Sequence, residues 1–185
     1  MPESIKTLQE LAFMYGTDKT DHGYIPFYEQ HLPKSPKKIL EIGVKEGRSI
    51  RMWLQHFPET VVHGLDLFKE DPVPFQHERV VWHQGDQRDW KMLELLRKEN
   101  FDVIIDDGSH NSRDQMMTFY GLFNGKHYFI EDLQCCSEEF YRDGLPFEVT
   151  AKNILFFGLS IYQHKNILCI NTLIAPKCSG LNPHN

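Results

Sequence analysis

Two acidic clusters in this sequence follow short apolar runs, and their residue types could support metal chemistry. The first, DDGSH at residues 106–110, ends one apolar run, and the second, Glu131 and Asp132, ends another. Short apolar runs of this kind are typical of buried parallel strands. Because ligands bind outside the carboxyl ends of the strands in an open parallel sheet, we expect both clusters at one rim. Three carboxylates and a histidine at one rim predict metal-assisted chemistry.

A hard divalent ion such as Mg²⁺ prefers oxygen ligands, which Asp107, Glu131 and Asp132 could supply. Two open coordination positions would suit a vicinal diol, whose hydroxyl pKa falls on coordination much as that of bound water does. His110 could then accept the proton, because an unperturbed imidazole titrates near neutral pH. The structural alternative is that the first cluster caps the following helix and the second is a solvated strand end.

A glycine loop follows an earlier strand-like run and is a candidate cofactor site. Glu41 ends the run, Gly43 and Gly47 follow, and a helix is expected to begin near Ser49. The two glycines allow the backbone to approach a ligand closely. The G-x-G-x-x-G spacing of dinucleotide sites is absent, which disfavours NAD and FAD. The charge of Glu41 would repel a pyrophosphate but suits the ammonium and sulfonium of S-adenosylmethionine. An ordinary tight turn is the alternative.

Later strand ends offer further cofactor contacts. Asp66 ends the next strand about 20 residues after the glycine loop, where an acid can accept both hydroxyl protons of an adenosine ribose. Capping of the following loop is its alternative role. Asp86 and Gln87 close a third strand and could bind the adenine edge, although a solvated turn explains them equally well. We also count Asp106 with the cofactor residues.

Alternating strand-like and helix-like runs begin near residue 38 and must position these groups. The alternation favours a parallel, doubly wound α/β sheet. Strand-like runs cover residues 39–43, 61–67, 79–84, 101–106 and 126–130, and helix-like runs cover 49–57, 90–98 and 111–123. Two β-rich runs, residues 153–162 and 166–174, are separated by 163–165 and predict a closing antiparallel hairpin.

The region before the first strand is predicted to be helical. Apolar residues at helical spacing up to Tyr15 predict a helix that stops at Gly16, and residues 24–32 predict a second, aromatic helix. Tyr24, Phe27 and Tyr28 could cover a ligand or pack onto the sheet. We therefore divide a single domain of 185 residues into three parts. These are a helical lid or cap segment (residues 1–36), a catalytic α/β core (37–176) and a loose tail (177–185).

Composition excludes several classes of partner. The formal charge of −6, with basic residues scattered along the chain, argues against nucleic acid. The longest apolar run cannot span a bilayer, so no membrane partner is expected. Four cysteines without zinc-type spacing or a disulfide framework predict reduced thiols and a cytoplasmic location.

Eight short blocks of the sequence together resemble one family, the magnesium-dependent class I sugar O-methyltransferases of macrolide and polyketide tailoring. The blocks IDDGSH (residues 105–110) and IEDLQ (130–134) are the most specific. The other blocks are YGTDK (15–19), HGY (22–24), LEIG (40–43), RMW (51–53), GLD (64–66) and GDQ (85–87). The resemblance covers most of the chain.

The resemblance implies a Rossmann-like methyltransferase fold, with a mostly parallel seven-stranded sheet and one reversed strand. It implies that Asp107, Glu131 and Asp132 ligate Mg²⁺ and that His110 deprotonates a hydroxyl of a glycoside or other diol. It also implies that S-adenosylmethionine is held by Glu41, Gly43, Asp66 and the segment around Asp86. A lid over the acceptor would come from residues 17–28, from the region after Leu133 or from a neighbouring subunit of a homo-oligomer.

The chain departs from the family pattern at three places, and three other functions stay open. Asn111 stands where a second histidine is common, Cys135 and Cys136 replace small hydroxyl residues, and residues 124–126 replace a Pro-Gly-Gly turn. The alternatives are methylation of a catechol-like phenol, a metal-dependent hydroxylase-like relative, and a non-catalytic subunit that binds S-adenosylmethionine. These departures bear on the acceptor more than on the cofactor.

Overall fold

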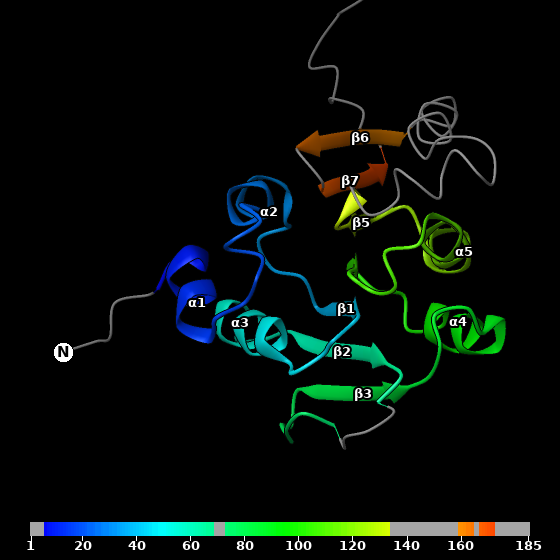
Figure 1. Cartoon of the computed structure of the whole chain (residues 1–185), viewed down its shortest axis with the longest axis horizontal. Coiled ribbons are helices and arrows are strands. Elements are labelled where there is room, and N and C mark those ends of the chain that lie inside the picture. Colours follow the sequence, from blue (N-terminus) through cyan, green and yellow to red (C-terminus); the bar gives the residue numbers. More distant parts are fainter. Residues whose placement is uncertain (1–5, 69–72, 134–158, 165–166, 173–185) are drawn as a thin grey trace, which may run out of the picture.

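A seven-stranded sheet forms the centre of the computed structural model, which describes residues 6–68, 73–133, 159–164 and 167–172. The strand order is β3-β2-β1-β4-β5-β7-β6 (Figure 1). β1 to β5 run parallel to their neighbours, whereas β7 is antiparallel to both β5 and β6. The bounds are β1 Lys38–Ile42, β2 Val61–Asp66, β3 Val80–Gln84, β4 Val103–Asp106, β5 His127–Ile130, β6 Leu159–His164 and β7 Ile167–Thr172.

Within the described residues, five helices cover the two faces of the sheet. Buried side chains of α1, α2 and α3 join one apolar core cluster, and those of α4 and α5 join the other, so the helices form two layers (Figure 1). None of these helices is both long and apolar enough to cross a membrane. Their bounds are α1 Leu8–Tyr15, α2 Ile25–His31, α3 Arg48–His56, α4 Trp90–Arg97 and α5 Ser112–Leu122.

Local sequence explains where the first helix begins and ends. Thr7 and Glu10 form a capping box, in which the Thr7 hydroxyl accepts from the Glu10 backbone and the Glu10 carboxylate accepts from the Thr7 backbone. Gly16 ends the helix in the left-handed conformation, with φ of 64°. The predicted stop at Gly16 is therefore confirmed, and the chain turns there toward the carboxyl ends of the strands.

The predicted α/β sheet with a closing antiparallel hairpin is confirmed. One detail is wrong: Gln163 and His164 were expected in the turn, but both belong to β6, because they pair with Leu168 and Ile167 of β7. Residues 153–158, expected to begin the first hairpin strand, lie outside the described residues, as does the predicted tail, 177–185.

The register of the central strands places the two acidic clusters at one edge. Ile42 of β1 is level with Asp106 of β4, which is level with Ile130 of β5. The residues that follow these three strands therefore lie side by side, and the expected common rim is confirmed. The packing is tightest at Gly43, whose φ is 83° and where a Cβ atom would lie 1.9 Å from the Asp107 carbonyl oxygen. Only glycine fits this position.

Candidate active site

A cleft of about 850 Å³ runs along this edge of the sheet. Its walls are the loops after β1, β2, β3, β4 and β5, together with the segment between α1 and α2. Five of the predicted cofactor residues line it: Gly43, Ser49, Asp66, Asp86 and Gln87. Asp107, His110 and Asp132 of the predicted metal and catalytic set line it too. Among the described residues that were predicted to contribute, Glu41, Gly47, Asp106 and Glu131 are not part of its lining.

Asp66 organises the glycine loop on the cofactor side of the cleft. One carboxylate oxygen, Oδ2, accepts hydrogen bonds from the backbone N–H groups of Val44 at 2.8 Å and Lys45 at 2.9 Å. Its other oxygen accepts from the Leu67 N–H at 2.6 Å. Asp66 therefore caps its own loop, the alternative that sequence analysis left open, while it also faces the cleft. Gly47, with φ of 71°, ends this loop and is the N-cap of α3.

Gln87 ties the ends of β3 and β4 together, next to the cleft. Its Oε1 accepts from the Ser109 backbone N–H at 2.7 Å, and its Nε2 donates to the Thr118 hydroxyl at 3.2 Å. Asp86 pairs instead with Arg88 at 2.6 Å, near the surface. These contacts leave Gln87 fixed and Asp86 in a position to meet a ligand at the mouth of the cleft.

Asp106 turns inward, away from the cleft lining. Its carboxyl group is fully buried and accepts a hydrogen bond from the Tyr128 hydroxyl at 3.1 Å. Burial raises the pKa of Asp106 to about 7, even though the Tyr128 hydroxyl and the amide of Gln87 favour its charged form. Within the described part of the chain, no cation shares the hydrogen bonds of Asp106, whereas the next residue, Asp107, is paired with Lys19.

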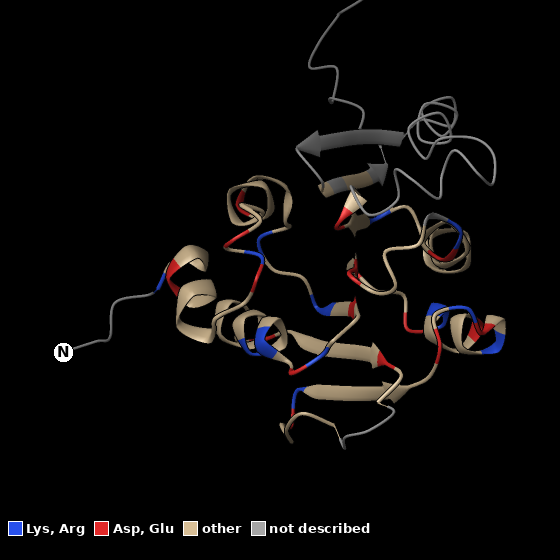
Figure 2. Cartoon of the chain, in the orientation of Figure 1, with Lys and Arg blue, Asp and Glu red and all other residues tan. Residues whose placement is uncertain are grey.

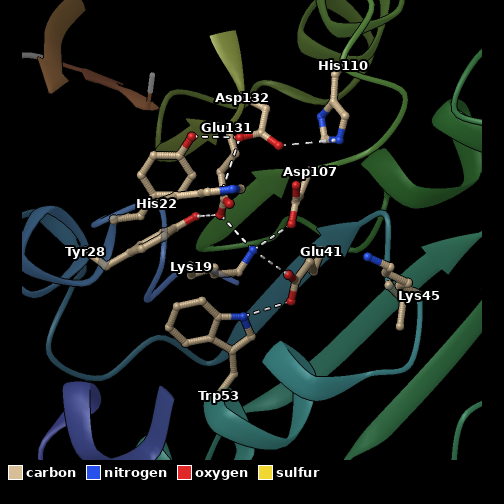
Figure 3. A network of polar contacts seen from close by, with 12 residues as sticks. Lys19, His22, Tyr28, Glu41, Lys45, Trp53, Asp107, His110, Glu131 and Asp132 are labelled. Atoms are coloured by element: carbon tan, nitrogen blue, oxygen red, sulfur yellow. Dashed lines mark hydrogen bonds and ion pairs between the residues drawn. The ribbon is translucent and has the colours of Figure 1, made fainter. Parts of the chain in front are cut away.

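Asp107, His110 and Asp132 bring one possible ligand atom each within 4.8 Å of one another. The His110 Nε2 lies 3.5 Å from Asp132 Oδ2 (Figure 3). His110 and Asp132 both have positive φ, 56° and 55°, which is uncommon for residues other than glycine and concentrates at functional sites. Oxygen and imidazole donors in this arrangement could hold a divalent cation.

Lys19 lies behind this group, in the centre of the polar network shown in Figure 3. Its Nζ is 2.7 Å from Asp107 Oδ2, 2.8 Å from Glu131 Oε1 and 3.2 Å from Glu41 Oε1. The lysine side chain is only 1% exposed. Burial opposes its charge, but the carboxylates of Asp107, Glu131 and Glu41 outweigh burial and hold the pKa of Lys19 well above its ordinary value. Glu41 also accepts from the Trp53 indole N–H at 2.8 Å.

Two tyrosines from the same N-terminal region reach the acid cluster. The Tyr24 hydroxyl donates to Asp132 Oδ1 at 2.7 Å, and the Tyr28 hydroxyl donates to Glu131 Oε1. Both rings are buried, and Tyr28 packs against Phe129 with ring centroids 4.8 Å apart. Of the two roles left open for these aromatics, the structure thus shows packing onto the sheet, with their hydroxyls directed into the cluster.

Sequence reasoning missed Lys19 as a functional residue. In the sequence Lys19 stands only as one residue of the YGTDK block, and a lysine in a polar, turn-rich segment is usually solvated. The contact that buries it spans 88 positions of sequence, from Lys19 to Asp107. The available signal was the position of this lysine in a block of the family resemblance. The metal-ligand role predicted for Glu131 stays a prediction, and since Oε1 binds Lys19 and Tyr28, only its other oxygen could reach an ion.

The strand order with a reversed β7 and a cleft at the carboxyl ends of the parallel strands define a Rossmann-like methyltransferase fold. A solved structure agrees: the MycE methyltransferase from the mycinamycin biosynthetic pathway, in complex with Mg and SAH, matches with a TM-score of 0.77 and 25% identity. The match covers 91% of this chain and 55% of that one. A second complex, which also holds mycinamycin VI, matches with a TM-score of 0.75 and 25% identity over 90% of this chain and 54% of that one.

Curated relatives point to the same class of enzyme. One relative, the 8-demethyl-8-(2-methoxy-alpha-L-rhamnosyl)-tetracenomycin-C 3'-O-methyltransferase of Streptomyces olivaceus, is 34% identical over 144 residues. Mycinamicin VI 2''-O-methyltransferase of Micromonospora griseorubida is also 34% identical over 144 residues. Each match covers 68% of this chain and 36% of the relative, so the chain spans about a third of their length. No family model matches. The predicted resemblance to sugar O-methyltransferases is confirmed.

Proposed function

We propose that this chain carries an S-adenosylmethionine-dependent O-methyltransferase activity that uses Mg²⁺ and acts on a hydroxyl of a sugar or other vicinal diol. The observation that carries the proposal is one cleft with a glycine loop held by Asp66 on one side and the group of Asp107, His110 and Asp132 on the other. The names of the relatives support this activity, and the solved relative was crystallised with Mg and SAH.

The cofactor side fits S-adenosylmethionine in shape and polarity. The close approach of Gly43 to the loop after β4 keeps the cleft floor free of side chains at that point. Asp66 faces the cleft where it can accept ribose hydroxyl protons, and Asp86 with Gln87 stands where an adenine edge can be bound. A volume of about 850 Å³ lies in the range of small-molecule sites, roughly 300–1,000 Å³, and leaves room for an acceptor.

The acid side fits a hard divalent cation. We assign Asp107 and Asp132 as ligands, with the second carboxylate oxygen of Glu131 as the third. When bound, Mg²⁺ would lower the pKa of the acceptor hydroxyl. His110 is the proposed general base, and Asp132, 3.5 Å from its Nε2, orients the imidazole.

Methyl transfer is then a matter of positioning. The acceptor oxygen attacks the methyl carbon in line, the carbon–sulfur bond breaks, and its electron pair stays on sulfur, giving S-adenosylhomocysteine. The hydroxyl proton goes to His110. The chain contributes by holding cofactor and acceptor in line.

Further segments would cover the acceptor. A glycoside acceptor would be covered by residues 17–28, by the region after Leu133, or by a second subunit of a homo-oligomer. The cytoplasmic location predicted from the cysteines belongs with a biosynthetic role of this kind. Neither nucleic acid nor a membrane is needed as a partner.

Transfer of a labelled methyl group tests the proposal. With S-adenosylmethionine, Mg²⁺ and mycinamicin VI or a panel of methyl rhamnosides, we expect product that disappears with a chelator. Asp107→Asn should lower the rate at least about a hundredfold. Asp102→Asn is the matched control at the opposite end of β4 and should leave the rate nearly unchanged. A rate that survives both the chelator and Asp107→Asn contradicts the proposal. Transfer to catechol alone would move the substrate class to phenols, and cofactor binding without any transfer would favour a non-catalytic subunit.

A further inference from the structure

The acid cluster has an inner and an outer half, and Lys19 separates them. The inner half consists of Glu41 and of two single oxygens, Glu131 Oε1 and Asp107 Oδ2, which surround the Lys19 ammonium at 2.7 to 3.2 Å. The other Glu131 oxygen is the one assigned above to the metal. The outer half consists of Asp132, His110 and the second oxygen of Asp107, which points away from Lys19 toward them (Figure 3). The outer half lines the cleft, whereas Glu41 and Glu131 are 0% and 2% exposed.

The inner half has the composition of a cation site. Three carboxylates converge on one buried point, two of them, Glu41 and Glu131, being buried themselves, and such a group is costly unless a cation compensates it. In this chain the compensating cation is part of the protein: it is the ammonium group of Lys19, which lies in the segment between α1 and α2. The Tyr28 hydroxyl and the Trp53 indole N–H donate to the same carboxylates and complete their hydrogen bonds.

We propose that Lys19 is a positioning residue that acts as a built-in cation of the inner half and thereby confines a divalent ion to the outer half. The proposal rests on the proposed function, because it concerns the metal of that reaction. An ion drawn in among Glu41 and Glu131 would sit away from the cleft, out of reach of an acceptor hydroxyl. The ammonium occupies that place and repels a second cation, so Lys19 lowers metal affinity and in exchange fixes the metal's location.

This role differs from simple structural support in the direction of its effect. A lysine that only holds the fold together would lower metal affinity when it is removed, because the ligands would lose their positions. A resident cation does the opposite, since its removal adds one unit of net negative charge next to Asp107. Metal affinity and transfer rate should then move in opposite directions.

The test measures the binding of Mn²⁺ alone to the full chain, without cofactor or acceptor. Electron paramagnetic resonance and calorimetry give the affinity. Lys19→Met removes the charge and keeps the length of the side chain, and Lys19→Arg is the charge-conserving control. We expect Lys19→Met to bind Mn²⁺ at least about tenfold more tightly than the unmodified chain, and to gain more thermal stability from Mn²⁺. Its methyl-transfer rate should nevertheless fall. Lys19→Arg should stay close to the unmodified chain in Mn²⁺ affinity.

A second pair of variants keeps the test decisive if Lys19→Met does not fold. Glu41→Gln and the double variant Glu41→Gln, Lys19→Met differ only in the lysine charge, and the first change relieves part of the buried negative charge. The double variant should again bind Mn²⁺ more tightly than Glu41→Gln alone.

Equal or weaker binding in both lysine-to-methionine variants overturns the proposal. If only these variants bind Mn²⁺ and the unmodified chain does not, the role of Lys19 stands and the metal step of the proposed function fails. If no variant binds Mn²⁺, both fail.

Discussion

Asp66 on the cofactor side of the cleft binds backbone N–H groups of a loop about 20 residues away, whereas the carboxylates on the acid side bind side chains that arrive from the far N-terminal region. The cofactor side lines the cleft, and there Asp66 and the Gln87 Oε1 atom accept from backbone N–H groups. The acid side gathers negative charge at the ends of β1, β4 and β5, as the red segments near the strand ends in Figure 2 show. Its compensating cation, Lys19, is buried.

This difference separates two ways of building a site. A loop that follows a parallel strand has its geometry set by local turns and by the register of the sheet, so the cofactor side depends mainly on nearby residues. Buried carboxylates need cations and hydroxyl donors in fixed positions, and the acid side takes them from Lys19, Tyr24 and Tyr28. The segment before β1 is therefore part of the site as well as a cover for one face of the sheet.

Among the substitutions that test the difference between the cofactor side and the acid side, we expect the largest effect from a change of Asp66. Asp66→Asn loses charge-assisted hydrogen bonds to Val44 and Lys45, which are worth about 1.5–3 kcal/mol, and should weaken binding of S-adenosylhomocysteine about tenfold to a hundredfold. Mn²⁺ affinity should stay unchanged, because the acid side is separate. Asp89→Asn is the matched control, since Asp89 caps α4 and asparagine is an equally good cap. A loss of Mn²⁺ binding in Asp66→Asn would break the separation of the two sides.

A second prediction compares Asp106, a buried acid without a cation, with Asp102 at the other end of β4. Because burial raises the pKa of Asp106 to about 7, the folded chain binds a proton between about pH 4 and pH 7 that the unfolded chain has released. The free energy of unfolding therefore falls as pH rises from about 4 to about 7, and this contribution levels off above pH 7. Asp106→Asn mimics the protonated acid, so it should remove this slope and stabilise the fold at pH 8 by on the order of 2 kcal/mol.

The matched control for this prediction is Asp102→Asn. The Asp102 carboxylate is partly buried, but its contacts with Lys126 and the backbone N–H groups of Lys37 and Lys38 hold its pKa below the ordinary value. Asp102→Asn should therefore lose stability at neutral pH. Denaturant unfolding between pH 5 and pH 8 measures both variants, and an unchanged pH slope in Asp106→Asn would contradict the assignment.

The smallest expected effect concerns the tyrosine that reaches Asp132. Tyr24→Phe removes a buried hydroxyl that donates at 2.7 Å, so we expect a loss of about 1 kcal/mol in stability. Mn²⁺ affinity should fall by about tenfold, because outer-sphere donors orient metal ligands. Tyr15→Phe is the control, since its hydroxyl bonds Gln55 at an exposed position. Equal Mn²⁺ affinity in the two variants would show that the N-terminal segment does not position the outer half.

Local signals in the sequence were enough for the sheet and for much of the cleft. The alternating runs and the stop at Gly16 predicted the fold, and the spacing of Gly43 and Asp66 placed both at the cleft. The inward turn of Asp106 and the burial of Lys19 depend on contacts that form only after the strands are assembled. A hydroxyl or ammonium 22 or 88 positions away leaves no periodic signal in the chain. The same limit explains why Asn111 was noted only as a departure, although it caps α5 by accepting from Arg113 and Asp114.

The most direct test of the account is a crystal structure of the full chain with S-adenosylhomocysteine and Mn²⁺, with the metal located by its anomalous signal. The account predicts the nucleoside against Asp66 and the glycine loop, and a single manganese peak in contact with Asp107, Asp132 and the second oxygen of Glu131. Lys19 should keep its place between Glu41 and the Glu131 Oε1 atom. A peak between Glu41 and Glu131 with Lys19 displaced would contradict it, as would bound cofactor with no manganese in the cleft.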